Sequence, residues 1–253
     1  MRVKLAVAYD GTEYHGWQLQ PNAITIEEEL NNCLSELLKE PIQVIGASRT
    51  DAGVHSLGNI AVFDTQTRMP AEKISYAMNQ RLPSDIRIQS SEECPADFHP
   101  RHCNTRKTYQ YRILSSEFEN PLFTRFCHHT HNHYNIEAMK EAAKYFVGEH
   151  DFASFCATAS SAQTTIREIY ELSVASEPAG NGINNCAELI TITVTGNGFL
   201  YNMVRIIAGT LMEVGVGRFA PTKMKEILDG KDRQLAGPTA PACGLLLYSY
   251  EFV

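Results

Sequence analysis

The chain has 253 residues, of which 43% are hydrophobic and 20% charged, and its formal net charge is −7. This composition is typical of a globular protein, and the length suffices for one large domain or two small ones. We expect a cytoplasmic protein with reduced thiols, because no apolar run reaches the roughly 18 residues of a membrane span, no export signal follows Met1, and the seven cysteines show no CxxC spacing.

The first half of the chain predicts the element order β-α-β-β-α-β. Its first helix has a capping box made by Thr25 and Glu28, a regular apolar face, and Pro41 directly after its expected end. The strands are expected at residues 3–10, 42–47, 58–63 and 86–90, and the helices at residues 25–40 and 71–82. This order is the split β-α-β motif.

The second half predicts a similar series of elements. Asn135 is a plausible N-cap for its first helix, and Gly148 lies just beyond the end of that helix. Two strand patterns flank the turn-rich segment PAGNGINN, which predicts a hairpin. The strands are expected at residues 107–114, 164–176, 187–196 and 244–252, and the helices at residues 136–147, 199–214 and 222–230.

Together these patterns predict an α+β fold. Two ferredoxin-like halves would share one long, mostly antiparallel sheet, and the central cleft between them would be the natural ligand site. We expect residues 1–100 to form an N-terminal half and residues 101–253 a C-terminal half. No low-complexity linker separates the two, which favours rigid docking.

The segment GASRTDAGVH, Gly46 to His55, is the strongest candidate for chemistry. Asp51 can act there as a general base, a nucleophile or a metal ligand, and an Asp-Ala-Gly sequence is also a common turn. Arg49 and His55 lie in the same short loop, and a simple hairpin does not need so many polar residues. The loop is therefore predicted to present Asp51 and Arg49 to a ligand.

Arg205 is the second candidate, because it lies in a strongly apolar helical pattern. A guanidinium stays charged and is costly to bury without an acidic partner. The helix has no acidic residue within one turn of Arg205, so we predict an ion pair with Asp51. The alternative is that Arg205 extends to water along its aliphatic stem.

A basic and aromatic strip follows the middle of the chain. Although the net charge argues against a general nucleic-acid binder, residues 98–116 contain no acidic residue. Such a strip can bind a phosphate backbone and stack against bases, although a solvated edge strand and ordinary cross-strand packing would explain it too. Its basic residues are Arg101, Arg106, Lys107 and Arg112, and its tyrosines are Tyr109 and Tyr111.

A histidine-rich run, CHHTHNH, resembles a metal-binding set. Strand alternation would bring Cys127, His129, His131 and His133 to one face. Structural metal sites more often take their ligands from separate segments, and the sequence has no CxxC or HExxH motif beside this run. A weakly basic strand at the rim of an RNA site is therefore the favoured interpretation.

The motifs of this chain resemble, in order, those of the tRNA pseudouridine synthase A family. Small departures occur at Ser48, Pro100 and Asn104, and none of them removes a functional group. The motifs that carry the resemblance are YDGTEYHGWQ, GASRTDAGVH, LPSDIRI, DFHPR, RKTYQYRI, GEHDFASF, TTIR, GNGFLYNMVRIIAGTL and GPTAPACGLLL.

The resemblance implies the activity of an isomerase. Members of this family convert uridine to pseudouridine at positions 38, 39 and 40 of the tRNA anticodon stem-loop. They act as homodimers and use neither a metal nor an organic cofactor. The resemblance therefore implies tRNA as partner and no role at a membrane.

The resemblance also assigns roles to individual residues. Asp51 corresponds to the catalytic nucleophile, and Arg205 to the arginine that pairs with it. Arg49 matches an arginine linked to extrusion of the target nucleotide. The remaining expected substrate contacts are Tyr109, Leu245, Arg106 and Lys107.

Two other functions are consistent with parts of this pattern. A non-catalytic RNA-binding protein on the same fold would be expected to lack Asp51, Tyr109 or Arg205, and all three are present. An enzyme that uses Asp51 as a base on a free sugar would not need the basic strip between Arg101 and Arg112. A polyanionic substrate is therefore favoured.

Overall fold

The structure is a computed structural model that describes residues 1–158, 162–179 and 187–253. Within this part of the chain, contacts divide the protein into two compact units. One unit is Met1–Asn104 with Leu247–Val253, and the other is Thr105–Leu246. The sequence suggested a boundary after residue 100, with the last strand in the second half; the contacts group most of that strand with the first unit.

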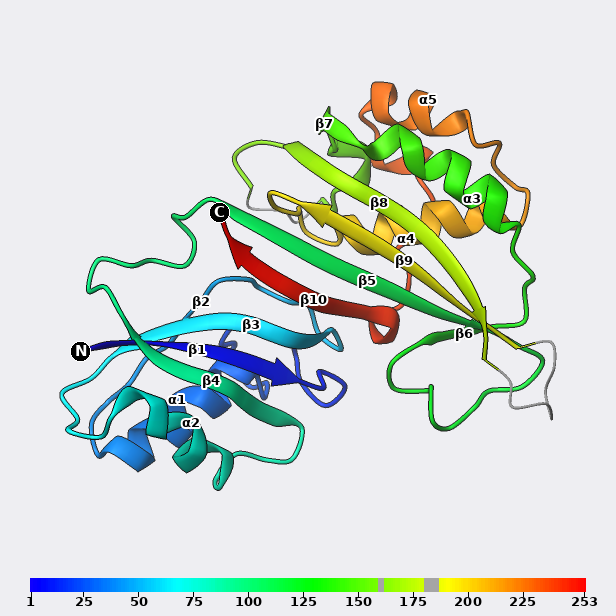
Figure 1. Cartoon of the computed structure of the whole chain (residues 1–253). Coiled ribbons are helices and arrows are strands. Elements are labelled where there is room, and N and C mark those ends of the chain that lie inside the picture. Colours follow the sequence, from blue (N-terminus) through cyan, green and yellow to red (C-terminus); the bar gives the residue numbers. More distant parts are fainter. Residues whose placement is uncertain (159–161, 180–186) are drawn as a thin grey trace. The chain divides into compact units, whose positions relative to one another are not determined.

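The first unit has the predicted order β-α-β-β-α-β, and the α+β class is confirmed. Strand β1 is antiparallel to both β4 and β3, and the short strand β2 pairs with β3. Helices α1 and α2 cover one face of this sheet (Figure 1). The elements are β1 (Arg2–Tyr9), α1 (Ile26–Leu38), β2 (Ile45–Gly46), β3 (His55–Asp64), α2 (Ala71–Asn79) and β4 (Ile86–Cys94).

Helix α1 begins and ends for the reasons that the sequence indicates. The Thr25 side chain accepts a hydrogen bond from the Glu28 backbone N–H at 3.3 Å, which confirms Thr25 as the N-cap. Lys39 takes a left-handed conformation with φ 59° and ends the helix before Pro41. The apolar face of α1 is fully buried at Leu30 and Leu34, in the hydrophobic core below β1 and β3.

The second unit is built on an antiparallel series of strands in the order β5, β9, β8 and β7, and β6 pairs with β5 in parallel. Helix α3 packs against α4 and β8. The turn predicted in PAGNGINN falls largely outside the described residues. The elements are β5 (Thr105–Ser115), β6 (His128–Thr130), α3 (Ile136–Ala143), β7 (Gly148–Asp151), β8 (Ile166–Pro178), β9 (Glu188–Gly196), α4 (Met203–Gly215), α5 (Lys223–Gly230) and β10 (Leu245–Phe252), whose first two residues belong here.

Two boundaries in this unit differ from the sequence prediction. Helix α4 begins at Met203 rather than near residue 199, because Asn202 takes a left-handed conformation with φ 60°. Helix α3 ends at Ala143, and a single 3₁₀ turn leads to β7, which the sequence did not predict. Asn135 caps α3 as expected, because its side chain accepts a hydrogen bond from the Ala138 N–H at 3.0 Å.

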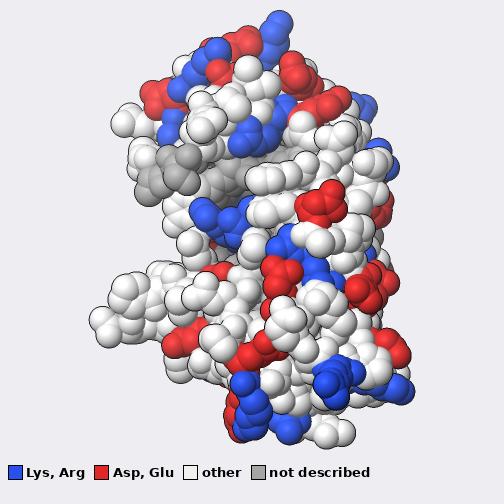
Figure 2. Space-filling model, turned by 90° about the vertical axis from the view of Figure 1, so that its left-hand side faces the viewer, with Lys and Arg blue, Asp and Glu red and all other residues white. Residues whose placement is uncertain are grey.

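The surface and the helices agree with the bulk composition. On the face shown in Figure 2, basic and acidic side chains are interspersed and form no continuous field of one sign. Among the described residues, no helix is both long and apolar enough to cross a bilayer. With a formal net charge of −7, attraction of a polyanion is expected to come from local clusters of basic residues.

Candidate active site

Asp51 lies in the loop that connects β2 to β3 in the first unit. Its side chain is half-buried. The Asp51 carbonyl accepts a hydrogen bond from the Val54 N–H at 3.1 Å, and Gly53 has φ +76°, so the Asp-Ala-Gly-Val segment forms a tight turn. The sequence left open whether this motif is a turn or a functional loop. It is a turn, and its first residue is the candidate nucleophile.

The turn is held by the segment that follows β1. The Trp17 N–H donates to the Thr50 carbonyl at 3.0 Å, and the Gly53 N–H donates to the Tyr14 carbonyl at 3.2 Å. The Tyr9 hydroxyl lies 2.8 Å from the Thr50 hydroxyl, within hydrogen-bond distance. Burial raises the pKa of Tyr9, so its hydroxyl stays protonated. The backbone around Asp51 is therefore held at Thr50, the residue before it, and at Gly53, two residues after it.

Two glycines of the YDGTEYHGWQ motif allow the two segments to approach this closely. A Cβ on Gly11 would lie 2.1 Å from the Val54 carbonyl oxygen. A Cβ on Gly16 would lie 2.5 Å from the Thr50 carbonyl oxygen, and Gly16 also has φ +90°. The segments YDGTEYHGWQ and GASRTDAGVH thus pack against each other, and their contacts position the backbone of Asp51.

Gly11→Ala should destabilise the first unit and reduce activity together. The added methyl group would force the Val54 carbonyl away from its position, and such overpacking typically costs about 1–3 kcal/mol. Gly58→Ala is the matched control, because a Cβ there meets no atom within 4 Å. Thermal unfolding and turnover of both variants provide the measurement; equal effects at the two positions would contradict the tight packing.

His55 begins β3 and is buried, with an exposed fraction of 2%. Its Nδ1 atom lies 3.1 Å from the Gly11 N–H nitrogen and 3.1 Å from an Asp10 carboxylate oxygen. The sequence suggested that His55 adds a polar group to the loop. These contacts instead tie the end of the loop to the residues that follow β1.

Arg49 lies in the same loop and is exposed. Among the described residues it forms no hydrogen bond or ion pair. The guanidinium of Arg101 approaches the loop from the segment after β4, and its Nε donates to the Gly46 carbonyl at 2.7 Å. The sequence placed Arg101 in the basic strip but gave no signal that it contacts the Asp51 loop.

Arg205 lies in the first turn of α4, in the second unit, and is half-buried. Its Nε donates to the Ala240 carbonyl at 2.7 Å, and its Nη1 donates to the Asn202 side-chain oxygen at 2.8 Å. These neutral acceptors hold the base of the guanidinium inside the unit. The ion pair with Asp51 stays a prediction.

Tyr109 and Tyr111 share the buried face of β5, as strand alternation predicted. Tyr111 is fully buried, its hydroxyl donates to the Pro241 carbonyl at 2.9 Å, and burial raises its pKa. Tyr109 packs edge-to-face against Phe199, with ring centres 5.1 Å apart. Both tyrosines are buried, but Tyr109 keeps an exposed fraction of 8% and Tyr111 none, so of the two only Tyr109 stays a predicted substrate contact.

Leu245 is the first residue of β10 and follows a short 3₁₀ turn at Ala242–Gly244. Its exposed fraction is 6%. A side chain of this kind offers an apolar surface and no polar group. That is consistent with the predicted contact to uracil, which stays a prediction.

Arg106 and Lys107 lie on opposite faces of β5. Lys107 is on the same face as Tyr109, whereas Arg106 is exposed on the other face. The Arg106 guanidinium lies 5.1 Å from the centre of the Tyr170 ring, a cation–π contact at the surface. The two residues therefore cannot act as one continuous patch.

Replacing Arg106 and Lys107 together by alanine should weaken the salt dependence of RNA binding. Each lost phosphate contact should reduce the slope of log affinity against log salt by roughly 0.7–0.9. The two single variants should identify which face meets the RNA. Lys140→Ala with Lys144→Ala on the exposed surface near α3 is the control; an unchanged slope in the double variant would exclude the strip as an RNA-binding surface.

The histidine-rich run forms only a short strand, because β6 spans His128–Thr130. His129 Nε2 lies 3.0 Å from the Ser116 carbonyl, and the rings of His129 and His131 are in edge-to-face contact. The expected alternation thus does not extend to His133. Within the described part of the chain, no group of three or more His, Cys, Asp or Glu residues could hold a metal ion.

A known protein family matches most of the chain. The family model described as tRNA pseudouridine synthase matches residues 5–102 and 142–253. The chain belongs to the tRNA pseudouridine synthase A family. It is an isomerase that modifies RNA. Asp51, Arg49, Arg205 and Leu245 lie inside the matched segments, whereas Tyr109 lies between them.

Curated relatives match over nearly the whole chain. The tRNA pseudouridine synthase A of Thermoanaerobacter sp. (strain X514) is 45% identical over 97% of this chain and 97% of that protein. That of Ruminiclostridium cellulolyticum is 46% identical with the same coverage. That of Bacillus subtilis is 39% identical over 100% of this chain and 99% of that protein. A solved chain from a Cbf5–Nop10–Gar1 complex aligns with 16% identity and a TM-score of 0.31, over 83% of this chain and 45% of that chain.

Proposed function

We propose that this chain converts uridine to pseudouridine at positions 38, 39 and 40 of the tRNA anticodon stem-loop. The observation that carries the proposal is the half-buried Asp51 at the start of a turn that two separate motifs hold in place. A backbone fixed on both sides of Asp51 suits a reaction that depends on the orientation of one carboxylate. The family of the chain supports the choice of tRNA.

The reaction needs no external atoms or electrons, because its product is an isomer of its substrate. The N1–C1′ glycosidic bond breaks, the uracil turns, and a C5–C1′ bond forms. The proton leaves C5, and N1 ends protonated. Asp51 can assist either by attacking C1′ or by removing a proton from C2′, and both paths use the ionised carboxylate.

The other candidate residues serve binding and positioning. The target uridine has to leave the stacked helix, which costs a few kcal/mol. A guanidinium at Arg49 and an aromatic ring at Tyr109 can offset that cost by charge and stacking. Leu245 would contact the uracil, and Arg205 would hold Asp51 ionised.

We also propose that the protein acts as a cytoplasmic homodimer without a metal or organic cofactor. Family membership supports the dimer, and the six cysteines among the described residues are all free thiols, as expected in a reducing compartment. Sedimentation equilibrium of the purified chain tests the dimer. A monomer at micromolar concentration would contradict it.

The function is tested by incubating the purified protein with unmodified tRNA and mapping pseudouridine at single-nucleotide resolution. The tRNA is folded first, and EDTA is then added in excess. We expect pseudouridine at positions 38–40 and none in tRNAs in which cytidine replaces all three uridines. Modification only elsewhere would contradict the proposed positions, and activity lost with a stoichiometric metal would contradict the absence of a metal cofactor.

A further inference from the structure

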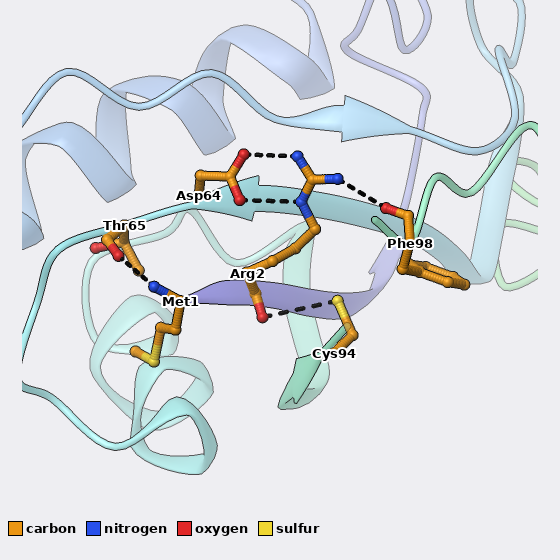
Figure 3. Close-up of polar contacts among 6 residues, drawn as sticks. All are labelled: Met1, Arg2, Asp64, Thr65, Cys94 and Phe98. Carbon is orange, nitrogen blue, oxygen red and sulfur yellow. Dashed lines mark hydrogen bonds and ion pairs between the residues drawn. The ribbon is translucent and has the colours of Figure 1, made fainter. Parts of the chain in front are cut away.

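The segment from Phe98 to Asn104 is fixed to the first unit by several contacts. Figure 3 shows Arg2 of β1 between Asp64 and Phe98: two of its nitrogens meet the Asp64 carboxylate at 2.9 and 2.6 Å, and Nη1 donates to the Phe98 carbonyl at 2.9 Å. The Tyr250 hydroxyl donates to the Pro100 carbonyl at 2.8 Å. The backbone on the N-terminal side of Arg101 is therefore held in place.

Contacts within the segment fix Arg101 further. The Arg101 N–H donates to His99 Nδ1 at 3.2 Å, and the His99 ring stacks on His102 with centres 3.9 Å apart. The Phe98 ring packs edge-to-face on Phe252 at 5.1 Å. An exposed arginine on so well anchored a backbone loses little entropy when it binds a ligand.

The Arg101 side chain reaches the loop that carries Asp51. Its Nε is occupied by the Gly46 carbonyl, three residues before Arg49. Within the described residues neither Nη group of Arg101 meets an acceptor, so both can bind a ligand. Burial and the nearby charge of Arg49 lower the pKa of Arg101, and Glu27 acts in the opposite direction. The Glu27 carboxylate already accepts the Leu19 N–H at 2.7 Å.

Arg49 therefore lies in the loop that carries Asp51, and Arg101 contacts the same loop. Among the described residues neither arginine has an acidic ion-pair partner. Two positive charges near one loop repel each other, and an anion bound to both reduces the repulsion. The free Nη groups of Arg101 form a planar fork that suits a phosphate. We propose that Arg101 and Arg49 together bind a phosphodiester of the RNA strand next to the target uridine.

This inference rests on the proposed function, and it adds Arg101 as a substrate-binding residue. A purely structural role is the alternative, in which Arg101 only holds the Gly46 carbonyl. The two roles differ in how strongly the positive charge of Arg101 makes RNA binding depend on salt. A phosphate contact depends on salt, whereas a hydrogen bond from Arg101 to a carbonyl of the protein depends on it much less.

The first test measures equilibrium binding of tRNA at several salt concentrations. Arg101→Gln should weaken binding about tenfold or more and reduce the salt slope by roughly 0.7–0.9, while Arg101→Lys should keep the slope. Arg81→Gln is the control, because Arg81 is exposed in the same unit and its guanidinium, within the described residues, donates to the Ala77 carbonyl alone. A wild-type slope in folded Arg101→Gln would overturn the proposal.

The second test changes the RNA, so its first comparison uses the wild-type protein alone. Single phosphates of an anticodon stem-loop RNA are replaced one at a time by uncharged methylphosphonate. The affinity of the wild-type protein should fall when a phosphate next to the target uridine is replaced. In Arg101→Gln, which already lacks this contact, the same replacement should cause no further loss of affinity. If neutralising every flanking phosphate leaves wild-type binding unchanged, the proposal is wrong. If the wild type forms no pseudouridine in tRNA, it is the proposed function that fails.

Discussion

Asp51→Asn should leave the fold intact and reduce pseudouridine formation by at least about 10²–10⁴-fold, the range typical of a lost catalytic acid–base or nucleophilic group. Asparagine keeps the size of the side chain and removes its charge. The turn depends on backbone contacts of Thr50, Asp51 and Gly53, none of which the substitution removes. Affinity for tRNA should change much less than turnover.

The measurement combines single-turnover kinetics with thermal unfolding and tRNA binding. Asp229→Asn is the matched control, because it makes the same chemical change at an exposed carboxylate of α5. The control should retain wild-type activity. Turnover of Asp51→Asn within tenfold of the wild type would show that another group performs the chemistry.

Local sequence patterns predict those elements of this fold that local forces determine. Helix α1 has its cap, its apolar face and its stop within one continuous stretch, and the structure confirms the cap at Thr25. Strands β1 and β5 alternate between buried and half-buried side chains, as their sequences indicate. In each case the residues that decide the outcome are neighbours in the chain.

Boundaries set by tertiary contacts are not visible in the same patterns. The apolar residues from Phe199 onward continue the helical pattern of α4, yet the helix begins only at Met203. The Asn202 amide oxygen accepts Arg205 Nη1 there and does not cap the helix. Strand β7 is four residues long, and it becomes visible only through its pairing with β8.

The candidate site is predictable in part for the same reason. The loop residues Arg49 and Asp51 are contiguous and share one motif. The packing of Gly11 against Val54, and of Arg101 on Gly46, joins residues more than 40 positions apart. A single sequence carries no sign of such contacts. It likewise could not tell Tyr111, which is fully buried, from Tyr109, which keeps an exposed fraction of 8%.

Arg205→Met should reduce turnover strongly and should also move the acid limb of the pH–rate profile to higher pH. A half-buried guanidinium in the apolar helix α4 is costly unless an acidic group meets it. If Asp51 meets that charge, Arg205 favours the ionised carboxylate, and its removal makes Asp51 easier to protonate. Both catalytic paths need the ionised form, so activity would be lost at a higher pH as the pH falls.

The stability of Arg205→Met separates this effect from a structural one. The variant loses the part-buried hydrogen bonds from the guanidinium to Ala240 and Asn202, and a hydrogen bond that involves a charged group typically contributes about 1.5–3 kcal/mol. Arg218→Met is the control, because Arg218 is exposed just beyond α4 and pairs with Glu213. A lower melting temperature with an unchanged acid limb would mean that Arg205 supports the fold alone. A shifted acid limb in Arg205→Met, absent from the control, is the result expected from an ion pair with Asp51.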